Sequence, residues 1–180
     1  MKRLAMLALT AALAGCASQD TLFRAAPDKT ALVDAPFSAS GRLSVRMDDR
    51  GQVANFEWQH SAESDQLAIN TPIGTTVARL TRDGQGVRLE SDGQTWQAPD
   101  VGALMQSRLG WSLPLENLAW WIRGRAAPGL PSSVDTDGSL LQQGWRIRFI
   151  ADSQAGALYP ARVDLSRDHL TIRLATYRWQ

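Results

Sequence analysis

The sequence predicts a mainly β fold with some α-helix: an antiparallel sheet of about nine to eleven strands, curled around its own apolar face. Two patterns support this prediction. Apolar and polar residues alternate along many short segments, and turn-forming residues separate these segments. The alternation is interrupted between residues 99 and 124, where apolar residues recur at helical spacing. We therefore expect a helical plug or lid inserted mid-chain, and the 180 residues fit a single domain.

The chain begins with a targeting segment. Lys2 and Arg3 precede an apolar run from Leu4 to Leu13, which is too short to span a membrane. The only cysteine follows, in Leu13-Ala14-Gly15-Cys16, and this run resembles the bacterial lipobox, whose cysteine receives a diacylglyceryl group. We expect residues 1–15 to be a lipoprotein signal peptide and Cys16 to be the acylated first residue. A secreted protein with a free thiol is the alternative.

Residues 16–36 are small and polar and include two prolines, so we expect a tether, with a short helix possible from Asp28 to Val33. Acylation would anchor it stably, because each buried methylene contributes about 0.8 kcal/mol and two or three chains are attached. Ala17 and Ser18 follow Cys16, in place of the Asp that retains lipoproteins in the inner membrane of enteric-type bacteria. By this resemblance the chain resides in the outer membrane and faces the periplasm.

The alternation begins at Phe37 and continues to Met47, with apolar residues and Gly41 at the odd positions and Ser or Arg at the even ones. After a turn from Asp48 to Gly51, the next strand places Ala54, Phe56 and Trp58 on one face. Further alternating pieces follow at 67–69, 77–80, 87–89, 145–149, 163–165 and 170–174. Short gaps between them favour antiparallel hairpins. Residues 37–180 therefore form one domain.

Two helices are predicted in the middle of the chain. Asp100 can cap the first, which Gly110 ends, and the second begins near Pro114 and stops at Gly124. Two short helices cannot cover nine strands laid flat, so the sheet is expected to curl around its apolar face. Beyond about eight strands, side chains no longer fill such an interior. An incompletely filled apolar interior is a candidate lipid site.

The composition argues against several function classes. The full chain carries a net charge of +1, so we expect no nucleic-acid partner. One cysteine and two histidines, His60 and His169, leave little for a metal site or a nucleophile–base–acid set. Both histidines are expected at the surface, and Asp65 is expected in a turn. We predict no catalytic residue, no metal, no cofactor and therefore no enzyme.

Two apolar features remain. The chain has seven tryptophans, and the adjacent pair Trp120 and Trp121 would lie about 100° apart on a helix, so that one faces the interior and the other the rim or a membrane. Pro72, Ile73 and Gly74 form a turn between two strands, with a large apolar residue where polar ones usually occur. Ile73 either packs under the sheet or forms an exposed tip that contacts lipid.

Together with the lipobox, several motifs resemble the LolB family of outer-membrane lipoprotein receptors. They occur in order along nearly the whole mature chain: Gly41-Arg42-Leu43, Ala54-Asn55-Phe56-Glu57-Trp58, Pro72-Ile73-Gly74-Thr75, Leu109-Gly110-Trp111-Ser112-Leu113-Pro114, Trp121-Ile122-Arg123-Gly124 and Gln143-Gly144-Trp145. The resemblance implies an unclosed antiparallel β-barrel with a helical lid and an apolar cavity for acyl chains. It also implies that Pro72, Ile73 and Gly74 form a membrane-insertion loop, in which Ile73 stands where the family carries Leu.

By the same resemblance, the chain would accept acylated lipoproteins from a LolA-type periplasmic carrier and deliver them to outer-membrane lipid without nucleotide or metal. We expect it to act as a monomer. The candidate cavity-lining residues are Leu43, Val45, Phe56, Trp58, Leu67, Ile69, Leu104, Leu118, Trp121, Trp145, Ile147 and Phe149.

Three other functions remain open from the sequence. The chain could be a lipid-anchored scaffold lipoprotein of an envelope assembly, which would have a filled interior and carry no lipid cargo. A soluble carrier would share the fold, but the lipobox argues against it. A periplasmic hydrolase would need a polar cluster that the sequence does not show.

Overall fold

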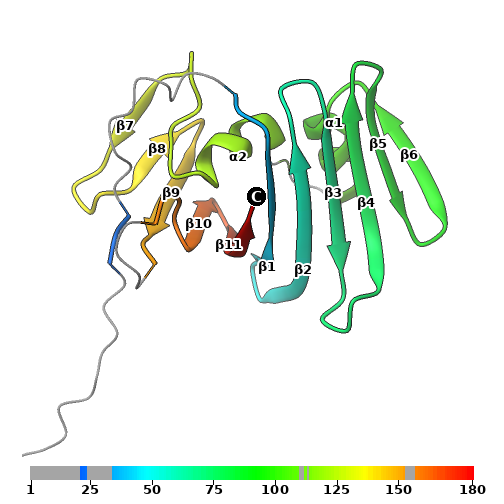
Figure 1. Ribbon diagram of the computed structural model, residues 1–180, viewed down its shortest axis with the longest axis horizontal. Helices are drawn as coiled ribbons and strands as arrows, with labels where there is room; N and C mark the ends of the chain where they lie inside the picture. The colour runs from blue at the N-terminus through cyan, green and yellow to red at the C-terminus, as the bar shows by residue number, and fades with distance from the viewer. Residues whose placement is uncertain (1–20, 24–33, 110–111, 113, 153–156) are drawn as a thin grey trace, which may run out of the picture.

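One antiparallel sheet of 11 strands forms the framework of the protein, in the order β6-β5-β4-β3-β2-β1-β11-β10-β9-β8-β7. The computed structural model describes residues 21–23, 34–109, 112, 114–152 and 157–180. The predicted signal peptide, Cys16, the possible helix from Asp28 to Val33 and Trp111 lie outside these residues. Figure 1 shows the sheet bent into a trough, with the two helices on its inner side.

Eight strands correspond to the predicted alternating segments, and the structure adds three short ones, β6, β7 and β8. Their bounds are β1 Phe37–Met47, β2 Arg50–His60, β3 Asp65–Asn70, β4 Thr76–Asp83, β5 Gly86–Ser91, β6 Gln94–Ala98, β7 Ser132–Val134, β8 Leu140–Gln142, β9 Trp145–Ile150, β10 Arg162–Arg167 and β11 Leu170–Trp179. The predicted fold class is therefore confirmed, at the upper end of the expected strand number.

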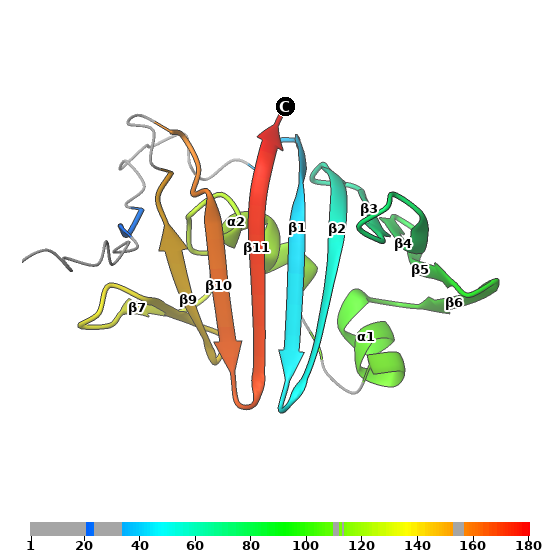
Figure 2. The same ribbon diagram turned by 90° about the horizontal axis from the view of Figure 1, so that it is seen from below.

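The helices interrupt the sheet where the sequence predicts them. Helix α1 runs over Val101–Leu109, and the Asp100 carboxylate caps it by accepting a 2.7 Å hydrogen bond from the Ala103 backbone N–H. Helix α2 runs over Leu115–Trp121, after Pro114, and ends three residues before Gly124. Figure 2 shows α2 behind the central strands and α1 beside the end of the sheet that holds β6.

The sheet is unclosed: its two outer strands, β6 and β7, lie at opposite ends of the strand order and do not pair with each other. The first and last strands of the chain instead meet at its centre, where β1 pairs with β11. A bulge at Ser40 and Gly41 bends this pair, and a Cβ atom on Gly41 would overlap the Ala175 carbonyl oxygen. Glycine is therefore required there, which explains the first motif of the sequence analysis.

Candidate functional site

The inner face of the sheet collects the predicted cavity residues. On β1, Leu43 and Val45 point inward; Phe56 on β2 lies opposite Ile69, and Trp58 lies opposite Leu67. In the other half of the sheet, on the same inner face, Ile147 and Phe149 point inward from β9. All twelve predicted residues belong to one apolar cluster, although they come from strands and helices far apart in the sequence.

Exposure divides these twelve residues into two groups. Seven are buried: Phe56, Trp58, Leu104, Leu118, Trp121, Trp145 and Ile147. Five are only partly buried against the same cluster: Leu43, Val45, Leu67, Ile69 and Phe149.

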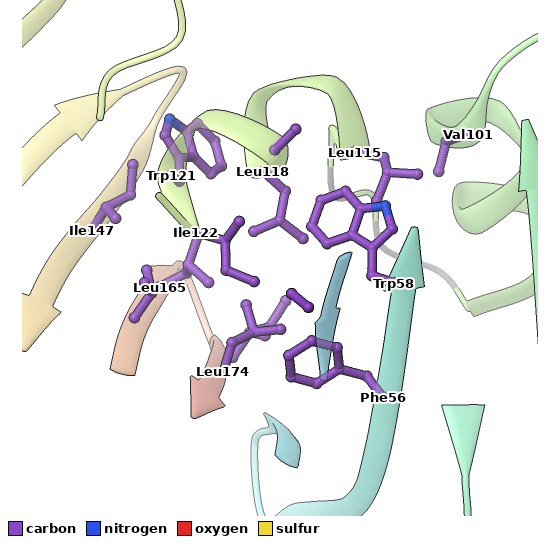
Figure 3. Close-up of a cluster of buried hydrophobic side chains, with 14 of the residues drawn as sticks. Phe56, Trp58, Val101, Leu115, Leu118, Trp121, Ile122, Ile147, Leu165 and Leu174 are labelled. Carbon is purple, nitrogen blue, oxygen red and sulfur yellow. The ribbon is translucent and has the colours of Figure 1, made fainter. Parts of the chain in front are cut away.

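The packed region of the inner face lies beneath α2. We define it by Trp121 and Ile122 at the end of the helix and by Ile147, Leu165 and Ile172 on β9, β10 and β11, all of which are fully buried. Figure 3 shows side chains of α2 in contact with side chains from strands in both halves of the sheet. These residues form a filled core.

The half-open region lies on β3 to β6 and the adjoining helix α1, toward the free edge of the sheet. We define it by Leu67, Ile69, Leu89, Trp96 and Met105, all of which are partly buried. Trp58, Leu67, Leu80, Leu89 and Trp96 form one row across β2 to β6, and α1 packs against β5 and β6 at its end. This region offers apolar side chains that the protein itself does not fully cover.

Two polar hollows lie near the apolar cluster. One, of about 370 Å³, opens where β1 begins and β2 ends, and serine and glutamine side chains provide much of its lining. Another of about 210 Å³ lies between Glu57, Asn70 and Arg79, and Leu67 borders it. Neither of these two hollows is lined mainly by the predicted acyl-cavity residues, which pack in one apolar cluster and are partly exposed only at its edge.

Gln142 fixes α2 and the following loop to the sheet. Its side-chain oxygen accepts 2.8 Å hydrogen bonds from Trp121 Nε1 and the Ala127 backbone N–H, and its amide nitrogen donates to the Ala127 and Leu130 carbonyls. The sequence predicts that one of the adjacent tryptophans faces the interior and the other the rim or a membrane, but both Trp120 and Trp121 are buried. Trp121 belongs to the apolar cluster, whereas Trp120 lies outside it with the Arg123 guanidinium 4.8 Å from its ring.

A chain of charged side chains connects α2 to the other side of the trough. In order, it consists of Arg82, Asp65, His60, Asp34 and Arg123. His60 Nδ1 lies 2.6 Å from Asp65 Oδ1, and His60 Nε2 lies 2.9 Å from Asp34 Oδ1. Arg82 Nε donates to Asp65 Oδ2, and Arg123 Nη2 donates to Asp34 Oδ1 at 2.9 Å. We call these five residues the charge ladder.

The prediction that His60 is a surface residue was wrong, because its side chain is buried; so was the placing of Asp65 in an ordinary turn, because it begins β3 and is also buried. The sequence held the signal: His60 continues the inward positions Ala54, Phe56 and Trp58 of β2. His169 is exposed, as expected.

The ladder shifts the protonation of its central residues. Burial alone would lower the pKa of His60, but hydrogen bonds to Asp65 and Asp34 and the charges of both carboxylates outweigh it and raise this pKa above its ordinary value. Burial would raise the pKa of Asp65, but hydrogen bonds from His60, Arg82 and Trp58 lower it. His60 with both ring nitrogens protonated can donate to both carboxylates. The ladder therefore favours a charged His60.

The β3–β4 turn presents Ile73 to solvent. Thr71 N–H donates to the Thr75 carbonyl, and the Gly74 and Thr75 N–H groups donate back to Thr71. Gly74 adopts a φ of 93°, which a residue with a side chain rarely accepts. Ile73 is 90% exposed. Of the two alternatives for this residue, the structure shows the exposed apolar tip.

No helix in the described part of the chain is long and apolar enough to cross a membrane. Within the same residues, no group of three or more His, Cys, Asp or Glu side chains could hold a metal ion.

An unclosed antiparallel sheet around an apolar interior, with short helices inside and an exposed apolar turn at one end, defines the class of open antiparallel half-barrels. The solved structure of a LolA superfamily protein from Nitrosomonas europaea shares this fold, with a TM-score of 0.52 over 82% of this chain and 86% of that one. The two are only 10% identical in sequence, so this likeness concerns the fold alone.

Sequence comparisons identify the family. The outer membrane lipoprotein LolB family matches residues 35–179. The LolB protein of Chromobacterium violaceum is 50% identical over 100% of this chain and 99% of its own length. That of Thiobacillus denitrificans is 37% identical over 100% of this chain and 98% of its own length. The chain belongs to the LolB family. This confirms the predicted family, the outer-membrane location of a lipid-anchored protein and the role in lipoprotein localisation, and it disfavours the scaffold alternative.

Proposed function

We propose that this protein accepts acylated lipoproteins from a LolA-type periplasmic carrier, binds their acyl chains on the inner face, and delivers them to outer-membrane lipid through the Ile73 turn. The half-open region carries this proposal, because it leaves apolar side chains partly uncovered beside a free sheet edge. We propose Cys16 as the acylated anchor and Pro72, Ile73 and Gly74 as the membrane-insertion loop.

The energetics support transfer without nucleotide or metal. Moving an acyl chain from water into an apolar site is favourable by about 0.8 kcal/mol per methylene. Moving it between two apolar sites is nearly neutral in this respect, so an affinity difference of about 1.4 kcal/mol gives a tenfold bias from carrier to receptor. The bilayer must then be the better site for the cargo to leave.

A transfer assay tests the acceptor role. The protein with Cys16 replaced is mixed with a carrier that holds a radiolabelled lipoprotein, the two are separated, and the label on each is counted. Label that moves onto this protein supports an acyl-binding acceptor. Label that stays on a carrier known to be active contradicts the proposal and favours the envelope scaffold.

Release into liposomes tests the Ile73 turn separately. Ile73→Glu should block release while leaving acceptance from the carrier intact, because a charged tip opposes entry into the acyl region of a bilayer. Leu158→Glu is the matched control, since Leu158 is 82% exposed in the loop between β9 and β10, at the other end of the sheet. Equal release by the two variants would exclude the turn as the insertion loop.

A further inference from the structure

The outer face of the sheet carries a group of arginines that the proposed function does not use. Arg42 and Arg46 alternate with serines on β1, and Arg173 on β11 lies opposite Ser44, between them. Arg148 on β9 faces Asp164, which in turn faces Arg173. We call Arg42, Arg46, Arg148 and Arg173 the arginine face. Figure 2 shows β9, β10, β11 and β1 side by side, with α2 behind them.

These arginines outnumber the carboxylates near them. Asp164 is held by Arg162, whose Nε and Nη2 atoms donate to it at 2.9 and 3.2 Å, and Arg173 Nε is farther away, at 3.8 Å. Arg148 lies near enough to Asp137 to help lower the pKa of that carboxyl, although hydrogen bonds from Ser139 lower it more. Among the described residues, Arg42 and Arg46 form no ion pair. A chain of net charge +1 thus concentrates positive charge on this face.

Exposed apolar side chains adjoin the arginine face at the Ile73 end. Val53 on β2 lies opposite Ser44, in the same row as Arg173, and is 53% exposed. Strand β3 ends at Asn70, opposite Asn55, and Asn55 Nδ2 donates to the Thr71 carbonyl at 3.5 Å. The turn that carries Ile73 therefore lies beside the Val53 end of β2. Figure 1 shows the β1–β2 and β3–β4 turns at the same end of the sheet.

We propose that the arginine face binds the anionic headgroups of a phospholipid bilayer, so that the domain lies with the outer surface of β1 and β11 against the membrane. Arginine guanidinium groups bind phosphate oxygens through paired hydrogen bonds, and each adds favourable energy near an anionic surface. An acidic protein would also complement the charge. Lipid is favoured because Val53 and Ile73 continue the surface with apolar side chains, the combination that binds at a bilayer interface.

In a lipid-anchored protein, this contact would fix the orientation of the domain on the membrane. An acyl anchor alone does not set that orientation, so the Ile73 turn would meet the bilayer in only some orientations. Binding through the arginine face would hold the turn beside the membrane and raise its effective concentration there. The proposal shares with the proposed function only the placing of Ile73 at the bilayer, and does not depend on acyl binding by the inner face.

Energy transfer in proteoliposomes tests the orientation. The full acylated protein is reconstituted into vesicles of phosphatidylcholine, with or without phosphatidylglycerol, and each vesicle carries a dansyl-labelled lipid. Transfer from the protein's tryptophans to the dansyl groups rises when the domain lies against the surface. We expect higher transfer on vesicles with phosphatidylglycerol, and a return to the phosphatidylcholine level at high salt.

Arg173→Gln should lower the ratio of docked to free domain about fivefold on anionic vesicles, and Arg42→Gln should act independently by a similar factor. Arg88→Gln is the matched control, because Arg88 is exposed on the outer face of β5, four strands away from β1, and is paired to a neighbouring carboxylate in a similar way. Arg173→Lys keeps the charge and should retain most of the docking.

Three results would overturn the proposal. Equal energy transfer on both kinds of vesicle, or an equal loss in Arg173→Gln and Arg88→Gln, would show that the arginine face does not bind lipid. Unchanged energy transfer with slower label transfer from the carrier would assign the face to an acidic protein partner instead. Failure of the acceptor role would appear only in the carrier assay, so the two proposals are tested separately.

Discussion

The packed and half-open regions of the inner face have the same sequence pattern but different surroundings. Both consist of alternating apolar residues on antiparallel strands, and both belong to one apolar cluster. In the packed region Ile147 and Leu165 are completely buried beneath α2, whereas in the half-open region Ile69 and Leu89 remain partly exposed. A helix of seven residues cannot cover an inner face that extends over 11 strands. The packed region therefore stabilises the fold, and the half-open region is where we propose that acyl chains bind.

Stability should separate the two regions most strongly. Ile147→Ala or Leu165→Ala should lower the free energy of unfolding by about 2–5 kcal/mol, because each leaves a cavity in a filled core. Ile69→Ala should lower it by about 1 kcal/mol, because part of its apolar area is already exposed and the site can relax toward solvent. Urea unfolding measures both. Equal losses at the two sites would show that the half-open region is as tightly packed as the core.

The attachment of α2 should have the next largest effect. Gln142→Ala leaves Trp121 Nε1 and the Ala127 backbone groups without their partners in a buried site. We expect a loss of about 1–3 kcal/mol in the free energy of unfolding. Gln66→Ala on the exposed side of β3 is the control and should change stability little. If Gln142→Ala matched this control, α2 would be held by apolar contacts alone.

Acyl binding should depend most on the half-open region, whereas stability depends most on the packed region. Ile69→Ala or Leu89→Ala should weaken binding of a fluorescent fatty acid about fivefold, which corresponds to about 1 kcal/mol of lost apolar contact. Val134→Ala is the control, because Val134 is an exposed apolar residue on edge strand β7. Unchanged affinity in the first two variants would place the acyl chains elsewhere, for example beneath a displaced α2.

The sequence predicted the framework well because β alternation is a local property. The inward set on β1 and β2 could be read directly from alternate residues, and Asp100 marked the start of α1. Which of the inward residues pack and which remain open could not be read, because this depends on where α2 lies against distant strands. His60 shows the same limit. We predicted it at the surface although its place on β2 continues the inward row, because Asp34 and Arg123, which make its burial favourable, are far away in the sequence.

The charge ladder should make stability depend on pH, with a smaller effect than the substitutions above. The pKa of His60 is raised in the folded protein, so its contribution is complete below the ordinary value of about 6.5 and is lost as pH rises through the folded pKa. The pKa of Asp65 is lowered, so its contribution is present above about 3.9 and is lost as pH falls through its folded value.

Unfolding experiments across pH should therefore give greatest stability in mildly acidic solution, with a decline toward alkaline pH of at most about 1.4 kcal/mol per pH unit. His60→Gln should remove the alkaline decline, because a neutral side chain has no proton to lose. His169→Gln should leave it unchanged, since this side chain is 86% exposed and lies 3.8 Å from Asp48. Because Asp34 and Arg123 connect His60 to the end of α2, we expect loss of this proton to loosen the helix that covers the packed region. A profile that His60→Gln did not alter would mean that α2 is held independently of the ladder.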